Sequence, residues 1–466
     1  MARHKIKVGF KNWYCYCFVL ISINLFSQTG ENSNWYFGNT AGITFNSGTP
    51  LALTNGVLTT TEGVATISSA TGNLLFYTDG VTVYNRNHVV MTNGTGLFGD
   101  GSSTQSAIIV KQPGNNNIYY IFTSDNDAGP NGICYSIVDM NLSFGFGAVT
   151  SKNISLYAPS CEKLCAIRNC NNVDLWVVSH DWNSNTFRAW SVNSLGVGTI
   201  QSWSLAGIVP TGITQSSYGQ LKASSDGRKL AACYYGFTTG GANILQIYDF
   251  NASTGFVSNA QTLATDQGLY GVEFSSNNRV LYASTNGGLL LQFNLCAPNI
   301  QSTRYVVSNA GPFIGSLQIG PDSKIYVARN QTSLSVINNP NVLGIGCNYT
   351  NLSLSLLGRS SRMGLPNFAS YYNMQELILN QPQELTCTSF QFNAPILQQN
   401  CNPVNYTYSW NFGDGTTSNQ LNPVHNYALP GTYTVTFTVN NGCISEQTSV
   451  DVTTNLSIFI SQINHN

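Results

Sequence analysis

A sequence repeat of two predicted β-strands joined by a turn recurs six times between residues 62 and 337, and it constrains the possible fold of this chain more than any other feature. Each copy has an apolar strand, a polar turn and a second strand rich in β-branched and aromatic residues, the pattern of a half-buried β-hairpin. The copies span residues 62–80, 105–125, 162–181, 218–236, 270–287 and 314–330, and their turns lie roughly 40 to 57 residues apart. That period is typical of four-stranded propeller blades, and the strand periodicity excludes a helical solenoid.

The two ends of the repeat region supply one further blade. Each repeat is followed by a third predicted strand and by a fourth with a weaker strand pattern, so the sequence predicts six four-stranded blades. Residues 34–39, 42–46 and 50–54 would form three strands of a seventh, and residues 364–372 (GLPNFASYY) its innermost strand. Joining the ends removes the unpaired strand edges of an open ring. We therefore expect an all-β, seven-bladed β-propeller over residues 29–373, with six or eight blades as alternatives.

The N-terminus has the pattern of a signal peptide. A basic region (Arg3, Lys5, Lys7, Lys11) precedes an apolar stretch over residues 13–26, and Ser27-Gln28 is a suitable cleavage site. A membrane anchor is the alternative, but spanning a bilayer takes roughly 20 apolar residues. We expect a cleaved segment at residues 1–28, a secreted or outer-surface protein, and no membrane span in the mature chain.

The charge content narrows the possible partners. Charged residues make up 8% of the chain and the net charge is -1. Phosphate binding needs a concentrated basic surface, so nucleic acid is set aside. An extracellular glycan or a cell-surface protein fits this composition better, and the oligomeric state stays open.

Twelve cysteines are present, of which Cys15 and Cys17 fall in the predicted signal peptide. The other ten would enter an oxidising compartment, where disulfides are common. Cys296 and Cys347 are one possible pair. The close spacing of Cys161, Cys165 and Cys170 is a weak zinc signal without paired CxxC motifs or a nearby His, so neither a metal nor a cofactor is expected.

In a propeller, the loops after the second strands and the loops entering the first strands gather on one face. The first set of loops contains Asp79, Asp125, His180, Asp181, Trp182 and Arg329, and the second contains Glu62, Gln105, Glu162, Tyr218 and Tyr270. Carboxylates, aromatic rings and one His around a central mouth could bind a glycan, a peptide or a divalent cation. His180 is the strongest single candidate, with a hydrogen-bonded loop histidine as the structural alternative. No catalytic motif is recognisable, so no catalytic residue is assigned.

Four segments carry a resemblance to a known class of protein: NWYFGNTAGITFNSGTP, LLFYTDGVTVYNRNH, STQSAIIV and VINNPNVLGIGCNY. Residues 34–372 resemble the propeller bodies of large secreted and cell-surface proteins of gliding bacteria. This resemblance implies cargo of the type IX secretion system, which typically ends in a sorting domain. The sequence ends at SIFISQINHN without such a domain, so a structural fragment of a larger surface protein is one hypothesis.

A second resemblance covers the C-terminal part of the chain. After a polar linker at residues 374–385, residues 386–455 resemble a PKD domain through YSWNFGDGTTSNQLNPVHNYALPGTYTVTFTV, and residues 456–466 form a tail. This implies an immunoglobulin-like β-sandwich. Trp410 is expected in its core, and Asp414 is expected to cap a turn rather than to bind metal.

These features favour a binding or adhesion protein, in which the propeller is the recognition face and the PKD module a spacer or second contact. The main alternative is a secreted glycosidase or polysaccharide lyase acting at the central face, which would need two converging carboxylates. Fold alone does not decide between them.

Overall fold

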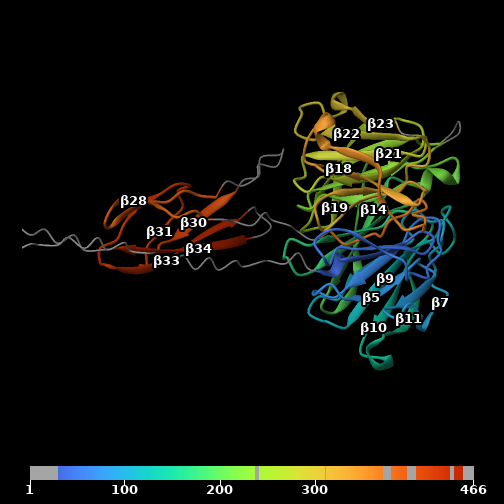
Figure 1. The fold of residues 1–466 in the computed structure, drawn as a ribbon, viewed down its shortest axis with the longest axis horizontal. Helices are drawn as coiled ribbons and strands as arrows, with labels where there is room; N and C mark the ends of the chain where they lie inside the picture. The colour runs from blue at the N-terminus through green and yellow to red at the C-terminus, as the bar shows by residue number, and fades with distance from the viewer. Residues whose placement is uncertain are drawn as a thin grey trace, which may run out of the picture.

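The structure is a computed structural model that describes residues 30–236, 241–309, 311–370, 379–395, 406–440 and 445–454. Its regular elements are 34 β-strands and five short 3-10 helices, so the described chain is all-β, as the sequence predicts. Figure 1 shows two bodies, formed by the described residues of 30–370 and by those of 379–454. The proposed signal peptide lies outside the described residues.

The larger body begins with a three-stranded sheet and an eight-stranded sheet. The first joins β1 (Asn34–Phe37), β2 (Ala41–Thr44) and β3 (Leu51–Leu53). The second has the order β4-β5-β6-β7-β11-β10-β9-β8 and contains β4 (Ala65–Ser68), β5 (Leu74–Thr78), β6 (Thr82–Asn85), β7 (Val90–Thr95), β8 (Ala107–Lys111), β9 (Ile118–Ser124), β10 (Ile133–Asp139) and β11 (Ala148–Tyr157). β7 and β11 are joined by a single parallel pair, Thr92 with Ala148. The eight-stranded sheet is therefore two antiparallel four-stranded halves that meet at their last strands.

Four further sheets follow, each with four antiparallel strands in chain order. They are β12 (Cys165–Arg168), β13 (Leu175–His180), β14 (Thr186–Asn193) and β15 (Gly196–Leu205); β16 (Leu221–Ala223), β17 (Lys229–Tyr234), β18 (Ile244–Asn251) and β19 (Phe256–Ala264); β20 (Leu269–Phe274), β21 (Val280–Thr285), β22 (Leu289–Asn294) and β23 (Tyr305–Asn309); and β24 (Leu317–Ile319), β25 (Ile325–Val327), β26 (Ser333–Ile337) and β27 (Tyr349–Ser355). The 3-10 helices are η1 (Gly30–Asn32), η2 (Ser143–Gly145), η3 (Thr214–Ser217), η4 (Gln301–Thr303) and η5 (Gly344–Cys347).

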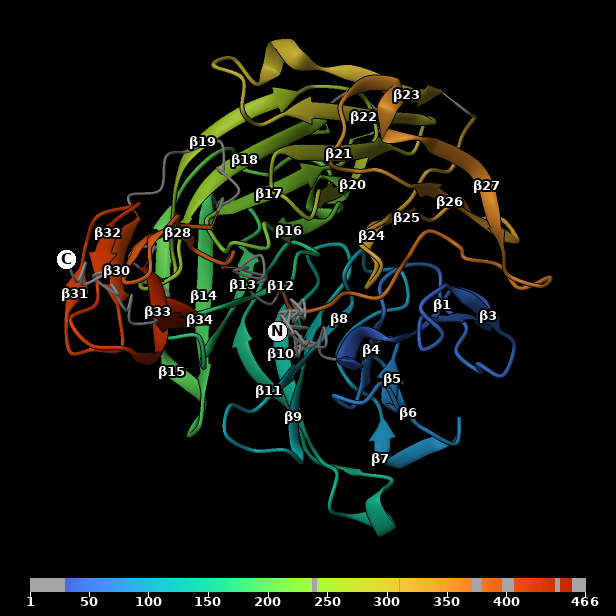
Figure 2. The same ribbon diagram turned by 60° about the vertical axis from the view of Figure 1, so that its left-hand side comes forward.

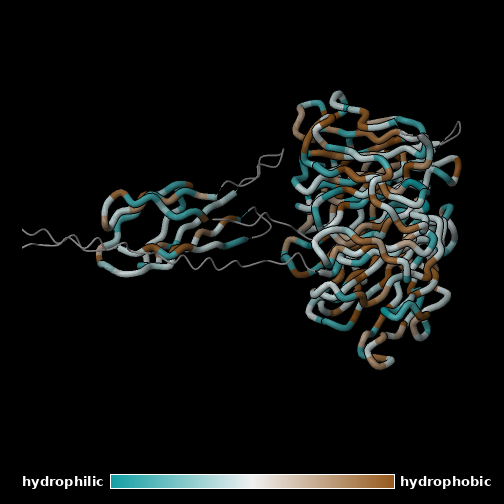
Figure 3. Tube along the Cα trace, in the orientation of Figure 1, coloured by the Kyte–Doolittle hydropathy of each residue, from teal (hydrophilic) through white to brown (hydrophobic). Residues whose placement is uncertain are grey.

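Hydrophobic cores join each group of strands to the next. Buried side chains of β5 and β9 share one core, and those of β17 and β21 share another. The last sheet packs on the first, where Tyr326 of β25 meets Trp35 of β1 edge to face with ring centroids 5.5 Å apart. Figure 2 shows the strand groups around a common centre, and Figure 3 shows apolar residues recurring along the strands. Burial of both sheet faces explains why the inner strands are almost continuously apolar.

The segment expected to complete the first sheet takes a different path. β1 pairs with β2, and no described residue of 364–370 pairs with β1. Instead, the backbone N–H of Asn367 donates to the carbonyl of Val64 at 2.8 Å, and that of Ser370 donates to Ala166 at 2.7 Å. The prediction of an innermost strand at 364–372 is therefore wrong for its described part. The segment runs from β4 to β12 because it satisfies polar groups at the inner ends of those strands.

The smaller body consists of two sheets. One has the order β28-β29-β32 and the other β31-β30-β33-β34, formed by β28 (Gln383–Thr386), β29 (Ser389–Gln391), β30 (Thr407–Asn411), β31 (Thr417–Ser418), β32 (Val424–Asn426), β33 (Gly431–Asn440) and β34 (Ser445–Thr454). Trp410 is fully buried, which confirms its predicted place in the core. Asp414 accepts the backbone N–H of Thr416 at 3.0 Å, which confirms the turn capping.

The predicted Cys296–Cys347 disulfide is wrong. Cys347 has a free thiol, which is buried in the core between the last two four-stranded sheets. Cys296 follows β22, where its sulfur accepts a hydrogen bond from Nε of Arg279 at 3.2 Å. The fold directs the Cys347 side chain inward with Tyr282 and Ile337, a placement that sequence spacing does not reveal.

Candidate functional site

A cavity of about 500 Å³ lies where loops entering the first strands meet loops following the second strands. Glu62 precedes β4 and Tyr218 precedes β16, while Tyr235 follows β17 and Asn286 follows β21. The described lining consists of Glu62, Ile213, Gln215, Tyr218, Tyr235, Tyr270, Asn286, Phe313, Asn330 and Met363. Glu62, Tyr218 and Tyr270 are thus three sequence candidates that the fold brings together in one cavity.

Tyrosine rings form one wall of this cavity. The Tyr218 and Tyr235 ring centroids are 5.9 Å apart, and those of Tyr235 and Tyr270 are 6.4 Å apart in an edge-to-face arrangement. The Tyr218 hydroxyl donates to Oδ1 of Asp127 at 2.6 Å, and Nδ2 of Asn286 donates to the Tyr235 hydroxyl at 3.3 Å. These bonds fix two of the rings and leave their faces for stacking contacts.

Two carboxyl groups interact at the base of the cavity. Burial raises the pKa of Glu62 well above its usual value, and the neighbouring Glu162 raises it further. Oε2 of Glu62 and the hydroxyl of Tyr270 are both enclosed, and the interaction of the carboxyl with Tyr270 and Thr104 offsets part of the rise in the Glu62 pKa. Burial also raises the pKa of Glu162 to about 7. Because like charges in a poorly solvated place resist joint ionisation, this pair holds a proton near neutral pH.

Both carboxylate oxygens of Glu162 accept hydrogen bonds from the surrounding protein. Its Oε2 accepts the backbone N–H of Thr104 at 2.7 Å and the Thr104 hydroxyl at 2.9 Å, while Oε1 accepts the N–H of Asp127 at 2.9 Å. The side chain has no exposed surface. It therefore positions the loop that carries Asp127, the partner of Tyr218, and does not itself present an oxygen to a ligand.

A buried lysine holds the backbone below Tyr218. Nζ of Lys163 donates to the carbonyls of Ser217, Tyr218 and Gly219 at 3.0, 2.8 and 3.1 Å, and it lies 4.6 Å from the centre of the Tyr234 ring. Burial lowers the pKa of this amine. Three carbonyl dipoles and an aromatic face satisfy the ammonium group, which is how a buried charge is tolerated.

Gln105, another candidate, bridges neighbouring sheets of the larger body and is not part of the cavity lining. Its Oε1 accepts the N–H groups of Leu164 and Leu221, and its Nε2 donates to the carbonyl of Leu221. Gln220 acts alike, because its Oε1 accepts the N–H groups of Val272 and Leu317. These amides bridge inner strands of neighbouring sheets and so have a structural role.

His180 is fully buried at the end of β13. Nδ1 lies 2.9 Å from the carbonyl of Asp181, and the ring meets Phe187 edge to face at 4.4 Å. Burial, aided by the positive charge of Lys163, lowers the pKa of His180 to about 3. The ring is therefore neutral and inaccessible at neutral pH, unlike the titratable loop residue that the sequence suggested.

The remaining candidates make local contacts outside the cavity lining. Asp79 accepts the N–H groups of Val81 and Thr82, and Asp125 accepts those of Asn126 and Asn131. Asp181 forms an ion pair with Arg188 at 2.8 Å. The backbone N–H of Trp182 donates to Pro159, and the guanidinium of Arg329 donates to the Tyr349 hydroxyl at 3.3 Å. These residues stabilise turns and loops on the same rim.

Sequence reasoning missed seven of the described lining residues: Ile213, Gln215, Tyr235, Asn286, Phe313, Asn330 and Met363. Tyr235, Asn286 and Asn330 follow second strands, and the other three residues before Met363 precede first strands, so they occupy the same kinds of loop as the predicted candidates. Met363 carries no such signal, because it follows β27 and only the fold brings that stretch to the cavity. No cluster of three or more His, Cys, Asp or Glu residues suited to a metal occurs within the described ranges.

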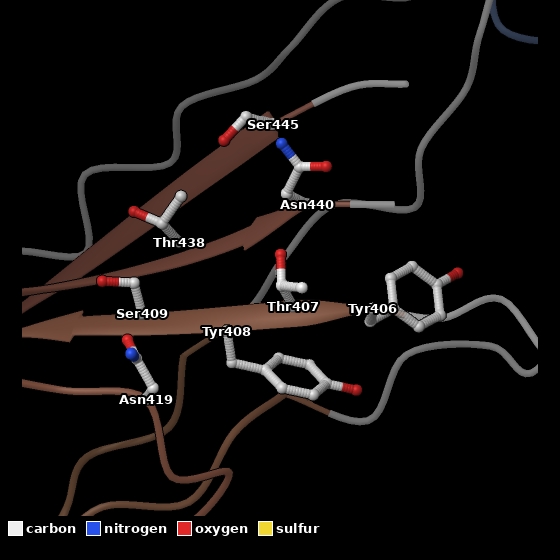
Figure 4. A pocket seen from close by; sticks show the side chains of 8 residues that line it. All are labelled: Tyr406, Thr407, Tyr408, Ser409, Asn419, Thr438, Asn440 and Ser445. Carbon is white, nitrogen blue, oxygen red and sulfur yellow. The ribbon is translucent and has the colours of Figure 1, made fainter. Parts of the chain in front are cut away.

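The smaller body has its own cavity of about 590 Å³. Figure 4 shows its lining side chains, which come mostly from β30 and β33 and the ends of neighbouring segments: Tyr406, Thr407, Tyr408, Ser409, Asn419, Thr438, Asn440 and Ser445. Hydroxyl and amide groups dominate, and none of these eight residues is acidic or basic. Such a surface suits hydrogen bonding and stacking rather than acid–base chemistry.

Comparisons with known proteins place the smaller body in a family. Residues 380–455 match the PKD domain, so the chain is an all-β protein whose C-terminal part is a PKD domain. A stretch of 49 residues is 53% identical to collagenase ColA of Bacillus cereus, covering 10% of this chain and 5% of the collagenase. The chain thus matches only about a twentieth of the length of that curated relative.

Solved structures are similar to this chain at low sequence identity. A putative 6-phosphogluconolactonase from Bacteroides uniformis is 11% identical, covering 84% of this chain and 96% of that chain with a TM-score of 0.40. A protein from Lactobacillus plantarum is also 11% identical, covering 72% of this chain and 98% of that chain with a TM-score of 0.43. Among the described residues, no helix has the length and apolar character needed to cross a bilayer.

Proposed function

We propose that this chain is a secreted or cell-surface binding protein, exported through a signal peptide at residues 1–28. Its larger body is the recognition module, for an extracellular glycan or a cell-surface protein, and its PKD domain is a spacer or second contact. The observation that carries this proposal is the cavity with three tyrosine rings, amide side chains and one carboxyl group, a combination typical of ligand sites.

The larger body is proposed to be a seven-bladed propeller spanning residues 29–373. The three-stranded sheet, the two halves of the eight-stranded sheet and the four later sheets make seven strand groups that share cores in sequence. The resemblance to surface proteins of gliding bacteria supports export by type IX secretion or an origin within a larger surface protein. Residues 374–385 are proposed as the linker and 456–466 as a tail, although β28 already begins at Gln383.

A glycosidase or lyase is the second candidate, favoured by the coupled Glu62 and Glu162 carboxyls. Glycoside hydrolysis needs two carboxyl groups that both reach the sugar. Glu162 is fully buried and already accepts three hydrogen bonds, so Glu62 alone is offered to the cavity. This arrangement supports binding over turnover.

The test measures binding and turnover together. The purified protein is screened on glycan and cell-surface protein panels while released reducing ends and unsaturated sugars are assayed, with and without calcium. We expect saturable binding without product, weakened at least tenfold by replacing Tyr235 with leucine. Product formation that disappears in Glu62→Gln would establish the enzyme instead, and a failure to bind any panel member would refute a recognition role.

A further inference from the structure

The cavity around Glu62, called the Glu62 cavity below, has an asymmetric charge environment. Its described lining contains one carboxyl group and no lysine, arginine or histidine. Asp127 and Glu162 stand directly behind the wall, bonded to Tyr218 and to the Asp127 backbone respectively. Three acidic groups thus gather on one side of a cavity that offers no basic side chain to an incoming anion.

Two buried cations of the larger body, Lys163 and Arg329, are engaged by the protein. Nζ of Lys163 is fully buried and bound by three carbonyl oxygens. The guanidinium of Arg329 donates to the Tyr349 hydroxyl and to the Gly311 carbonyl. Neither group forms part of the lining, so neither is presented to a ligand.

The aromatic wall adds a second preference for positive charge. The ring face of a tyrosine or phenylalanine carries negative potential and attracts a cation within about 6 Å of its centre. Tyr218, Tyr235 and Tyr270 follow one another around the wall, and Phe313, which is 49% exposed, adds a fourth ring. A ligand cation in this cavity would meet several ring faces and the Glu62 carboxyl together.

We infer that the Glu62 cavity binds an amino sugar, with its ammonium group between the tyrosine rings and the Glu62 carboxyl. This inference rests on the proposed recognition function and names its ligand. A sugar is favoured over a single lysine side chain because a cavity of about 500 Å³ exceeds what one aminoalkyl chain fills. Gln215, Asn286 and Asn330 offer amide groups to ring hydroxyls, and Oδ1 of Asn286 has no hydrogen-bond partner.

Two matched oligosaccharides test the inference. A β-1,4-linked glucosamine tetramer and its fully N-acetylated counterpart share one backbone and differ in their ammonium groups. Near neutral pH the buried Glu62 carboxyl holds a proton, which an entering ammonium group displaces because an opposite charge favours the ionised carboxylate. Calorimetric titration of the full protein at pH 6 is expected to give about tenfold tighter binding of the free amine form, since cation–π contacts and the ion pair formed in this way are worth about one power of ten in a partly desolvated site. Equal affinities, or tighter binding of the acetylated form, would overturn the inference while leaving the recognition function intact.

Variants identify the groups responsible. Glu62→Gln is expected to bring the preference for the amine close to one, because the ion pair with the ammonium group is lost. The control Glu384→Gln, on the exposed strand β28, should keep the full preference. If Glu62→Gln fails to fold, Phe313→Leu is the second test variant, because it removes an exposed aromatic ring. It should weaken binding of the amine tetramer about threefold more than binding of the acetylated tetramer.

Two further outcomes contradict the inference in distinct ways. A lysine-containing peptide that binds tighter than the glucosamine tetramer, and competes with it, would show that the cavity takes a protein side chain. Binding of no saccharide and no peptide would refute the proposed function together with its ligand. A preference for the amine that survives both Glu62→Gln and Phe313→Leu would locate the selective site elsewhere on the protein.

Discussion

Two buried groups give this protein opposing responses to acid. His180 has its pKa lowered from 6.5 to about 3 by burial, so the unfolded chain binds a proton below pH 6.5 while the folded chain does not. Stability is therefore lost as pH falls below 6.5. Glu162 has its pKa raised from 4.5 to about 7, so the folded chain binds a proton first, and stability is gained as pH falls from 7 to 4.5.

The changes in the free energy of unfolding due to His180 and Glu162 are similar in size between pH 6.5 and 4.5, where both groups contribute. Each pH unit between the folded and unfolded pKa values is worth about 1.4 kcal/mol. Between pH 6.5 and 4.5, His180 therefore removes about 3 kcal/mol of stability and Glu162 supplies about the same amount. We expect these two contributions to cancel in the unmodified protein, so that only their separate removal makes either visible.

The perturbations are His180→Phe and Glu162→Gln, studied by scanning calorimetry from pH 4.5 to 7.5. Relative to the unmodified protein, His180→Phe should gain about 3 kcal/mol between pH 6.5 and 4.5, and Glu162→Gln should lose about the same. For a domain of this size that corresponds to about 4 °C in the unfolding midpoint. The lost hydrogen bond to Asp181 adds a pH-independent cost of about 1 kcal/mol to the first variant.

Comparing each variant with the unmodified protein cancels the titration of the shared groups that do not interact with the replaced residue; Glu62, whose pKa Glu162 raises, is not among these for Glu162→Gln. The exposed Glu384→Gln serves as the control and should leave the pH profile unchanged. The reasoning is refuted if both variants shift the midpoint in the same direction on acidification, or if neither shows a pH-dependent difference.

Three other substitutions test the packing. Gly364→Ala places a methyl carbon 1.7 Å from the carbonyl oxygen of Glu62 and should cost at least about 3 kcal/mol in denaturant unfolding, whereas Gly287→Ala, with its nearest neighbour at 3.8 Å, should be nearly neutral. Lys163→Met removes the ammonium donor from three buried carbonyls and should destabilise by about 3 to 5 kcal/mol, against less than about 0.5 kcal/mol for the peripheral Lys152→Met; equal effects would contradict the role of the buried amine. Trp410→Ala should cost about 3 to 5 kcal/mol and lower only the calorimetric transition of the PKD domain, so a parallel fall in the other transition would show that the two bodies unfold together.

Local sequence patterns were sufficient to predict the β-strands and the PKD domain. The alternation around Trp410 and the apolar–turn–apolar phrases are encoded within windows of about ten to twenty residues, because side-chain direction in a strand repeats every two residues. The same local logic gave the Asp414 turn, since a carboxylate can cap its own backbone without any distant partner.

The sequence predicted the candidate site only in part. The rule for loop positions found Glu62, Tyr218 and Tyr270, because position after or before a strand depends on chain order alone. It also selected His180 and Gln105, which the structure buries. Whether a loop side chain faces the mouth or the interior depends on the neighbouring sheets that cover it, and these are distant in sequence.

The sequence by itself determined the all-β class, the hairpin repeat and the C-terminal PKD module. Only the tertiary structure decided that residues 364–370 cross the centre, that Cys347 stays a free buried thiol, and that Glu62 lies in a cavity while Glu162 lies behind it. Strand formation is a local property set by backbone geometry and residue periodicity. Burial, pKa and cavity shape arise from contacts between segments far apart in the chain, and a single sequence does not encode those contacts in any local pattern.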